Sequence, residues 1–301
     1  MAPATAADEG RHAPSTSPLW QETWHFDFAT PDASLGGHLR LGTFPNQGVS
    51  WLWAAVVGDG RRLVTVVEHE APIPRLGSLD LRCDALWADL VCESPMEHWS
   101  VGLEAFGVAL DEPADAYRGL RGDRIGVGFD LGWETVGEAQ AGGRVDGVGR
   151  ADVACDVSGE VLLGDEVVQL DGWGSRSHTW GVDEWWAAPW EAGAGRLDDG
   201  TRWCVRPGDG AATPGAPGPS IDLRVGEDGR GGRDGDGHRL PGGASVTVDD
   251  LRLRCGPLHL SPVPIVAPDG RHSRVVHAMA RTTADDGRTG AAWLVSNRPG
   301  A

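Results

Sequence analysis

The sequence predicts an all-β protein built from two antiparallel β units, barrels or sandwiches, that pack together. Short runs in which apolar and polar residues alternate with period two recur along the chain, and 45 glycines and 20 prolines punctuate them. Long helical patterns do not separate these runs, which is typical of antiparallel rather than parallel sheets. With 301 residues the chain exceeds the usual length of one domain, which favours two units.

The N-terminal unit is expected to span residues 20–165. Residues 1–19 are rich in Ala, Pro, Ser and Thr without periodicity, so we expect a disordered leader. Only Pro113–Leu120 has a pattern that a helix would tolerate. Alternation begins close to Trp20 and predicts strands in this order: Thr23–Phe28, His38–Phe44, Val49–Val57, Arg61–His69, Leu79–Cys92, His98–Leu110, Ile125–Val136 and Ala151–Leu163.

The C-terminal unit is expected to span residues 166–301. Within it, residues 208–241 contain the low-complexity stretches GDGAATPGAPGPS and GEDGRGGRDGDGHR, which cannot support a packed core. We therefore expect an exposed loop there. Turn sequences separate the remaining runs, which predict strands at Glu166–Gln169, Thr201–Val205, Ser245–Arg254, Leu258–Ile265, Ser273–Thr283 and Gly290–Ser296.

The charge balance argues against nucleic acid as a partner. The chain has 44 acidic against 26 basic residues, and its formal net charge of −18 would repel phosphate backbones. The first residues lack the apolar and basic segments of a signal peptide, and no run of about 18 apolar residues occurs. The five cysteines are odd in number and widely spaced, which fits a reducing compartment. We therefore expect a cytoplasmic protein with no membrane span.

Residues 171–190, with the sequence DGWGSRSHTWGVDEWWAAPW, carry the densest functional signal. Five of the 14 tryptophans lie in this stretch. Arg176, His178 and Trp180 alternate, so on a strand they would share one face. The glycines at 172, 174 and 181 permit tight turns or close backbone approach. The pattern predicts a surface that combines a cation, a titratable imidazole and an indole.

This stretch resembles the G-x-G-x-R-D-H-x-W-G pattern of a bacterial family related to carotenoid 1,2-hydratase (hydroxyneurosporene synthase) and the AttH-like proteins. The resemblance implies tandem lipocalin-like β units with an apolar cavity. It also implies relatives that add water to isoprenoid double bonds or cyclise natural products, so it predicts the fold more firmly than the reaction. Further similarity lies in the opening Trp24-x-Phe26-x-Phe28 followed by Gly36-Gly37, in VGEAQ at 136–140, and in GAAW at 290–293 followed by Asn297-Arg298-Pro299.

The sequence departs from the family pattern at three acidic positions. Ser177 stands where the pattern has Asp before His, and the Tyr-x-Asp pair expected on the strand near Trp203 is replaced by Trp203-Cys204-Val205. Val295 stands where the last strand commonly has an acidic residue. Hydration of an unactivated alkene needs a strong proton donor, so these losses put that reaction in doubt.

Other residues of the stretch 171–190 offer a proton donor in place of these lost carboxyl groups. Asp183 and Glu184 follow the motif directly, and burial against a neighbouring indole would raise the pKa of either carboxyl and keep it protonated. His178 would act as a base or orient water, and indole faces would stabilise a developing carbocation. The candidate catalytic residues are His178, Asp183 and Glu184, and the candidate ligand-binding residues are Trp173, Arg176, Trp180 and Trp186.

Three functional hypotheses remain open at this stage. The leading one is a protein that binds a hydrophobic small molecule, of terpenoid, steroid or acyl type, in an apolar cavity. The alternative is a cofactor-independent hydratase, isomerase or cyclase acting on an isoprenoid or polyketide-like substrate, and the third is a partner-binding module. Arg176 also has a structural interpretation, in which it closes the bottom of a barrel against Trp24. Since no metal-ligand spacing, P-loop or dinucleotide motif occurs in a credible setting, we expect neither a metal nor a cofactor.

Overall fold

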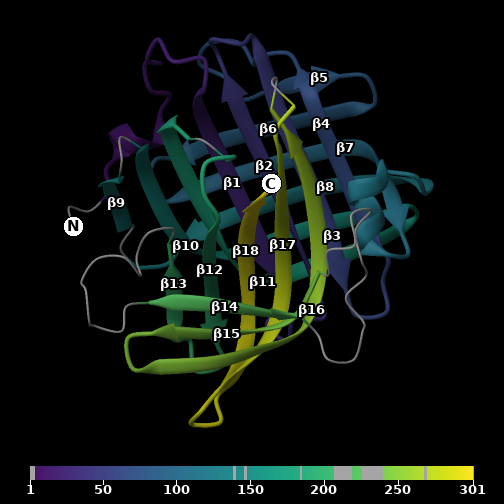
Figure 1. The fold of residues 1–301 in the computed structure, drawn as a ribbon, viewed down its shortest axis with the longest axis vertical. Helices are drawn as coiled ribbons and strands as arrows, with labels where there is room; N and C mark the ends of the chain where they lie inside the picture. Colours follow the sequence, from purple (N-terminus) through teal and green to yellow (C-terminus); the bar gives the residue numbers. More distant parts are fainter. Residues whose placement is uncertain are drawn as a thin grey trace.

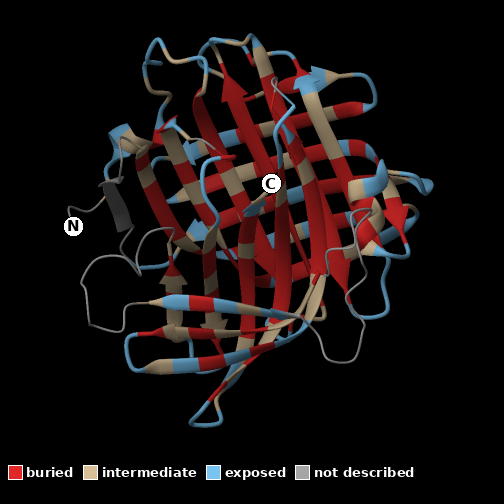
Figure 2. Cartoon of the chain, viewed as in Figure 1, coloured by how far each residue is buried: buried red, intermediate tan, exposed pale blue. Residues whose placement is uncertain are grey.

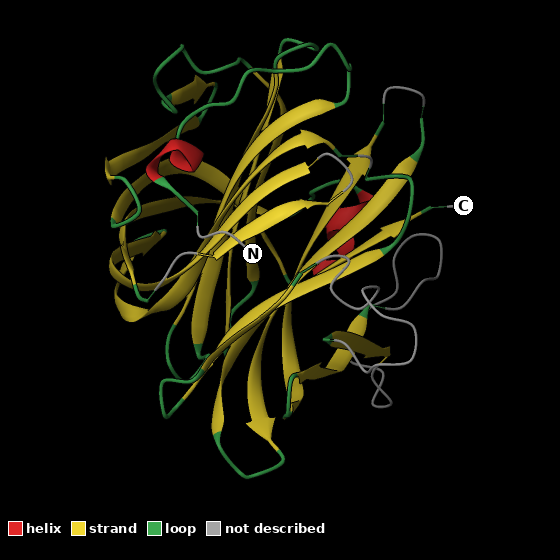
Figure 3. Ribbon diagram, turned by 90° about the vertical axis from the view of Figure 1, so that its left-hand side faces the viewer, coloured by secondary structure: helices red, strands yellow, loops and turns green. Residues whose placement is uncertain are grey.

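The computed structural model describes residues 4–137, 140–145, 148–183, 185–206, 219–225, 240–267 and 270–300. The described chain forms two antiparallel β-sheets, so the prediction of an all-β fold is confirmed (Figure 1). Two short 3₁₀ helices, η1 (Ala6–Glu9) and η2 (Pro113–Arg118), account for the helical part of the described chain (Figure 3). None of the helices in these ranges has the length and apolar character needed to cross a membrane.

The first sheet closes into a barrel. Its strands follow the order β4-β3-β2-β1-β11-β10-β8-β7-β6-β5, with β9 paired to β10, and β4 also pairs with β7. That last pairing joins the two ends of the run from β4 to β7 at one end of β4, where residues 63–65 pair with residues 108–110. The strands are β1 (Trp20–Ala29), β2 (Leu35–Phe44), β3 (Val49–Gly58), β4 (Leu63–Ala71), β5 (Leu81–Cys83), β6 (Leu86–Ser94), β7 (His98–Leu110), β8 (Asp123–Thr135), β9 (Gln140–Val145), β10 (Val148–Leu163) and β11 (Glu166–Val182).

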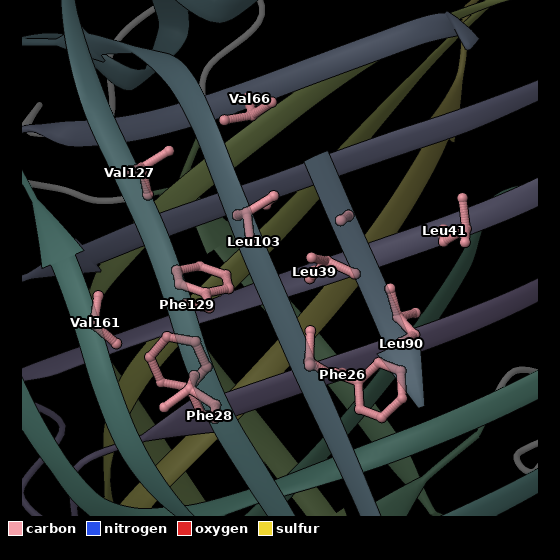
Figure 4. Close-up of a cluster of buried hydrophobic side chains, with 14 of the residues drawn as sticks. Phe26, Phe28, Leu39, Leu41, Val66, Leu90, Leu103, Val127, Phe129 and Val161 are labelled. Carbon is pink, nitrogen blue, oxygen red and sulfur yellow. The ribbon is translucent and has the colours of Figure 1, made fainter. Parts of the chain in front are cut away.

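Alternate side chains of these strands fill the barrel. Phe26 and Phe28 of β1 meet Phe129 of β8 and Leu39 of β2 in one buried cluster (Figure 4). Because side chains of a strand point alternately to its two faces, the residues between them must face outward. Most of the outward residues of β1 to β3 are nevertheless buried, since the second sheet covers them.

The second sheet lies across the outer face of the barrel. Its order is β13-β12-β18-β17-β16-β15-β14, and β16 contacts β3 and β4 while β18 contacts β1 (Figure 1). Trp293 Nε1 donates to the backbone oxygen of Phe28 at 2.9 Å across this interface. Buried residues therefore run through the middle of both sheets (Figure 2). The strands are β12 (Trp190–Leu197), β13 (Arg202–Val205), β14 (Ser220–Val225), β15 (Pro241–Val248), β16 (Leu251–Val266), β17 (His272–Ala284) and β18 (Thr289–Pro299).

Strand β11 belongs to the first sheet. Period-two alternation predicted a second unit from residue 166 and a strand that ends at Gln169, but β11 runs to Val182 and pairs with both β1 and β10. The second sheet therefore starts at Trp190. Of the predicted loop 208–241, residues 208–218 and 226–239 lie outside the described residues, while Ser220–Val225 forms β14.

The N-terminal segment, residues 4–19, differs from the disordered leader that its composition predicts. Glu9 is only 8% exposed, and its carboxylate accepts hydrogen bonds from Arg176 Nη1 at 2.6 Å and from Trp99 Nε1 at 2.9 Å. A charged residue that enters an apolar barrel must find a partner there, and Arg176 of β11 provides it. The segment is thus held to the barrel by a buried ion pair, which composition alone does not reveal.

Candidate functional site: an intersheet pocket with two carboxylates

The two sheets enclose a pocket of about 790 Å³. Residues of β1, β10 and β11 form the wall contributed by the first sheet, and residues of β12, β13 and β18 form the opposite wall. The exposed residues Asp249, Asp250 and Asp286 are among those that line the pocket, so it is open to solvent beside them. A pocket of this size accommodates a small organic molecule.

Successive side chains of a strand point to opposite faces, and this alternation determines which side chains reach the pocket. Trp24 and Phe26 of β1 point into the barrel, so His25 and Asp27 point to the second sheet. In the antiparallel register Asp27 lies opposite Ser175 of β11. By the same rule Asp152 of β10 lies opposite Ser177 of β11, and both line the pocket. Two carboxyl groups are thereby placed in one cavity.

Asp27 is a carboxyl group with a strongly raised pKa. It is 4% exposed and accepts hydrogen bonds from the Ser175 backbone N–H at 2.7 Å and from the Ser175 hydroxyl at 2.6 Å. Burial raises the pKa of Asp27 to about 7, and although these hydrogen bonds favour the ionised form, they do not compensate for the lost hydration. The nearby negative charge of Asp152 raises the pKa further. Near neutral pH, Asp27 therefore exists both with and without its proton.

Asp152 has the opposite behaviour in the same pocket. Its oxygens accept hydrogen bonds from Arg150 Nε at 2.8 and 2.9 Å, from Arg206 Nε at 2.6 Å, and from the Ser177 hydroxyl. Burial alone would raise the pKa of Asp152, but the charges of Arg150 and Arg206, with these hydrogen bonds, outweigh burial and hold the pKa at about 2. Asp152 therefore stays ionised.

Neutral histidines lie beside Asp27. His25 Nε2 is 3.8 Å from Asp27 Oδ2, and burial together with the positive charges of Arg40 and Arg150 lowers the pKa of His25 to about 3. Behind it, His277 stacks on His38 with ring centroids 4.1 Å apart, and burial lowers the pKa of both rings well below the usual value. Asp27 thus adjoins an imidazole that stays uncharged at neutral pH.

The structure separates the predicted motif residues onto two faces of β11. Trp173 lines the intersheet pocket, together with Ser175 and Ser177. Arg176 and His178, one residue out of step with them, lie on the opposite face, where they pair across the strands with Phe26 and Trp24 of β1. Trp180 stacks on His12 of the N-terminal segment, with ring centroids 3.7 Å apart.

The remaining predicted residues follow the motif. Asp183 is partly buried, and burial raises its pKa against the opposing charges of Arg40 and Arg150. Glu184 lies outside the described residues. Trp186 is buried in a separate cluster between the sheets, with Arg271 over its ring at 5.6 Å, and it does not line the pocket.

Four residues at positions where the resemblance predicted polar or acidic side chains, Ser177, Trp203, Val205 and Val295, line the pocket. The Ser177 hydroxyl donates to Asp152 directly across the strand pair, so a carboxylate from β10 lies beside Ser177 in the pocket wall. Sequence reasoning missed both Asp27 and Asp152. The only sequence signal for Asp27 was the alternation in residues 24–28 (WHFDF), which places Asp27 on the strand face opposite Trp24 and Phe26. The sequence did not show that this face is buried.

Comparisons with known proteins place this fold among solved structures. An AttH-like protein of Nitrosomonas europaea matches with a TM-score of 0.58 and 12% identity over 96% of this chain and 94% of that one. CghA, in a structure with Sch210972, matches with a TM-score of 0.53 and 10% identity over 96% and 94%. Kievitone hydratase of Nectria haematococca matches with a TM-score of 0.52 and 9% identity over 94% and 90%.

These likenesses establish the fold that the three proteins share with this chain. No curated protein sequence gives a significant match. A family model described as a domain of unknown function, DUF7064, matches residues 5–300. That span includes the N-terminal segment, the barrel and the second sheet, and the chain therefore belongs to the DUF7064 family.

Proposed function

We propose that the intersheet pocket catalyses a cofactor-independent, acid-initiated reaction of an apolar alkene, either hydration or cyclisation. The observation that carries this proposal is the pair of carboxyl groups whose pKa values are driven apart, Asp27 to about 7 and Asp152 to about 2. An environment that separates two carboxyl groups in this way assigns one as proton donor and the other as permanent anion. Asp27 is the proton donor in this scheme.

Cyclisation needs no reactant besides the substrate, and hydration needs one molecule of water. The Asp27 carboxyl gives its proton to one alkene carbon, whose π electron pair forms the new C–H bond, and a carbocation remains on the other carbon. Water adds to this carbon and releases a proton, which returns to the Asp27 carboxylate. In cyclisation, an electron pair of the substrate itself closes the ring and the departing proton takes the same route.

The substrate is proposed to be an isoprenoid or polyketide-like molecule. Trp203, Trp293 and Val295 line the pocket and offer apolar surface to such a substrate. The fold is shared with kievitone hydratase and with CghA, whose structure was determined with Sch210972. The similarity of the stretch around His178 to the carotenoid 1,2-hydratase pattern supports the same class of chemistry.

Simple binding of a hydrophobic ligand is the competing proposal. Apolar walls alone would suffice for it, and a buried carboxyl with its pKa near 7 would then only weaken the fold. The enzymatic proposal explains why a carboxyl group with its pKa near 7 is kept inside the cavity. We therefore favour catalysis.

Isotope labelling tests the proposal. The purified protein is incubated in ¹⁸O-labelled water with a panel of apolar alkenes that carry isoprenyl double bonds, and the products are analysed by mass spectrometry. A product that contains one added, labelled water shows hydration, and an isomer of the substrate with a new ring shows cyclisation. The Asp27→Asn variant serves as the control for background reaction.

Two outcomes would count against the proposed hydration or cyclisation. Stoichiometric recovery of unchanged ligand bound to the protein would support the binding proposal. An oxygenated product without label would show an oxidation that the pocket residues do not explain.

A further inference from the structure

Three side chains from distant parts of the sequence meet at one end of the barrel, away from the intersheet pocket. They are His12 of the N-terminal segment, Glu22 of β1 and His178 of β11, and their ligand atoms all lie within 4.8 Å of one another. His12 Nδ1 is 2.9 Å and His178 Nε2 is 3.1 Å from the same carboxylate oxygen, Glu22 Oε1. Glu22 is 2% and His178 4% exposed.

The hydrogen bonds determine which ring nitrogen of His178 carries the proton. Its Nδ1 lies 2.6 Å from the backbone oxygen of Asp8, which can only accept, so Nδ1 carries a hydrogen. The other ring nitrogen, Nε2, faces Glu22 Oε1, which is itself an acceptor. Two electron-rich atoms that face each other inside a protein need a cation between them, either a proton or a metal ion.

The surroundings match those of a metal ligand. A ligating histidine usually donates its other N–H to a backbone carbonyl or carboxylate, which fixes the ring, and His178 does so to Asp8. Trp24 stacks on His178 at 4.6 Å and Trp180 on His12 at 3.7 Å, so both imidazoles are held in place. The His12 side chain is 23% exposed, which leaves an approach for an ion and for a solvent ligand.

We propose that His12, Glu22 and His178 bind one divalent transition-metal ion of the zinc class. Two imidazoles and one carboxylate form the ligand set that zinc takes with a fourth, solvent position. Because His12 belongs to the N-terminal segment while Glu22 and His178 belong to the barrel, the ion fastens the segment to the barrel. The spacing of these ligands along the chain does not resemble a metal-binding motif, since they are separated by 10 and 156 positions.

Cobalt(II) is the probe for this site, because its visible absorption reports nitrogen and oxygen coordination. Chelator-treated protein is titrated with Co²⁺ and then with Zn²⁺. We expect one equivalent of Co²⁺ to bind with visible absorption bands, Zn²⁺ to displace it, and Zn²⁺ to raise the Tm by several degrees. His12→Ala should weaken Co²⁺ binding at least about 100-fold, since loss of even an outer partner of a ligand costs about 10–100-fold.

The variants are chosen so that folding does not obscure the result. His12 lies in the N-terminal segment, so its replacement leaves the barrel core intact, and Glu22→Gln is a second, nearly isosteric test. His98→Ala is the matched control, because His98 is a partly exposed histidine bonded to the single carboxylate of Glu134, and its loss should leave Co²⁺ affinity unchanged.

Absence of Co²⁺ binding would overturn the proposal and leave a shared proton as the cation. Binding that survives both His12→Ala and Glu22→Gln would also overturn it. If the Co²⁺ affinity falls in His277→Gln instead, the ion binds to the cluster of His25, His38 and His277. The assignment to His12, Glu22 and His178 would then be wrong.

Discussion

Replacement of Asp27 by asparagine is expected to lower turnover by about 10²–10⁴-fold, the usual contribution of a positioned general acid. Asparagine keeps the size of the side chain and can still accept the Ser175 N–H bond, but it has no proton to give. The rate of product formation in the labelling assay measures the effect. Asp130→Asn, at an exposed position of β8, is the matched control and should leave turnover unchanged.

The stability of this variant separates catalysis from misfolding. Since the pKa of Asp27 is about 7 in the folded protein against an ordinary 3.8, the folded state holds a proton that the unfolded state has lost between about pH 4 and pH 7. The stability that Asp27 contributes is therefore present below about pH 4 and is lost as the pH rises through 7, at about 1.4 kcal/mol per pH unit.

Asp27→Asn has no charge to bury and should be more stable than the wild type above pH 7, by up to roughly 4 kcal/mol. Denaturant unfolding of the two proteins at pH 5 and pH 8 measures this difference, and subtraction removes the opposite contribution of the buried histidines. If Asp27→Asn is inactive but more stable than the wild type at pH 8, its loss of turnover comes from the missing proton donor and not from misfolding. Full activity of Asp27→Asn would rule out its role as the acid.

Replacement of Arg176 by methionine is expected to cost about 3–5 kcal/mol of unfolding free energy, because it leaves the Glu9 carboxylate buried without its partner. Both side chains of this ion pair are 6% exposed. Turnover should not change once the protein is folded, since Arg176 lies on the face of β11 opposite the pocket. Urea unfolding and protease sensitivity of the N-terminal segment are the measurements.

A double variant, Glu9→Gln with Arg176→Met, should recover most of that loss because no unpaired charge remains. A loss of less than about 1 kcal/mol in Arg176→Met would instead be typical of an exposed pair and would contradict a structural role. A selective loss of ligand affinity would revive the interpretation of Arg176 as a ligand-binding residue.

Period-two alternation predicted most strands, but it ended the strand that became β11 too early. Glycines at 172 and 174 resemble turn residues, so the predicted strand stopped at Gln169. In the structure these glycines lie in the middle of a strand, where a Cβ on Gly174 would come within 2.0 Å of the Asp27 backbone oxygen and one on Gly172 within 2.2 Å of the Ala29 oxygen. The glycines permit close approach of β1, which local sequence cannot distinguish from a turn.

The sequence predicted one shared surface for the candidate residues of 171–190, but in the structure those on β11 divide between its two faces. The sequence showed that Arg176 and His178 share a face, and the register confirms it. It could not show that the barrel interior lies on that side and the second sheet on the other, because both faces of β11 are covered. For the same reason Asp27 and Asp152, which alternate with buried residues, resembled ordinary solvent-facing positions.

The N-terminal segment illustrates a second limit. Its composition indicates disorder, and its order depends on contacts with positions more than 80 residues away, such as Glu9 with Trp99 and Arg176. Long-range ion pairs leave no local pattern in the sequence.

The pKa of Asp27 tests the central claim most directly, and it needs no substrate. Protein labelled with ¹³C at the aspartate carboxyl carbons is titrated by NMR, and the Asp27 signal is assigned by its absence in Asp27→Asn. We predict that this carboxyl titrates close to pH 7, well above the ordinary value of 3.8 for an aspartate. A titration close to pH 4 would contradict the account, because Asp27 would then be ionised at neutral pH and could not donate the proton.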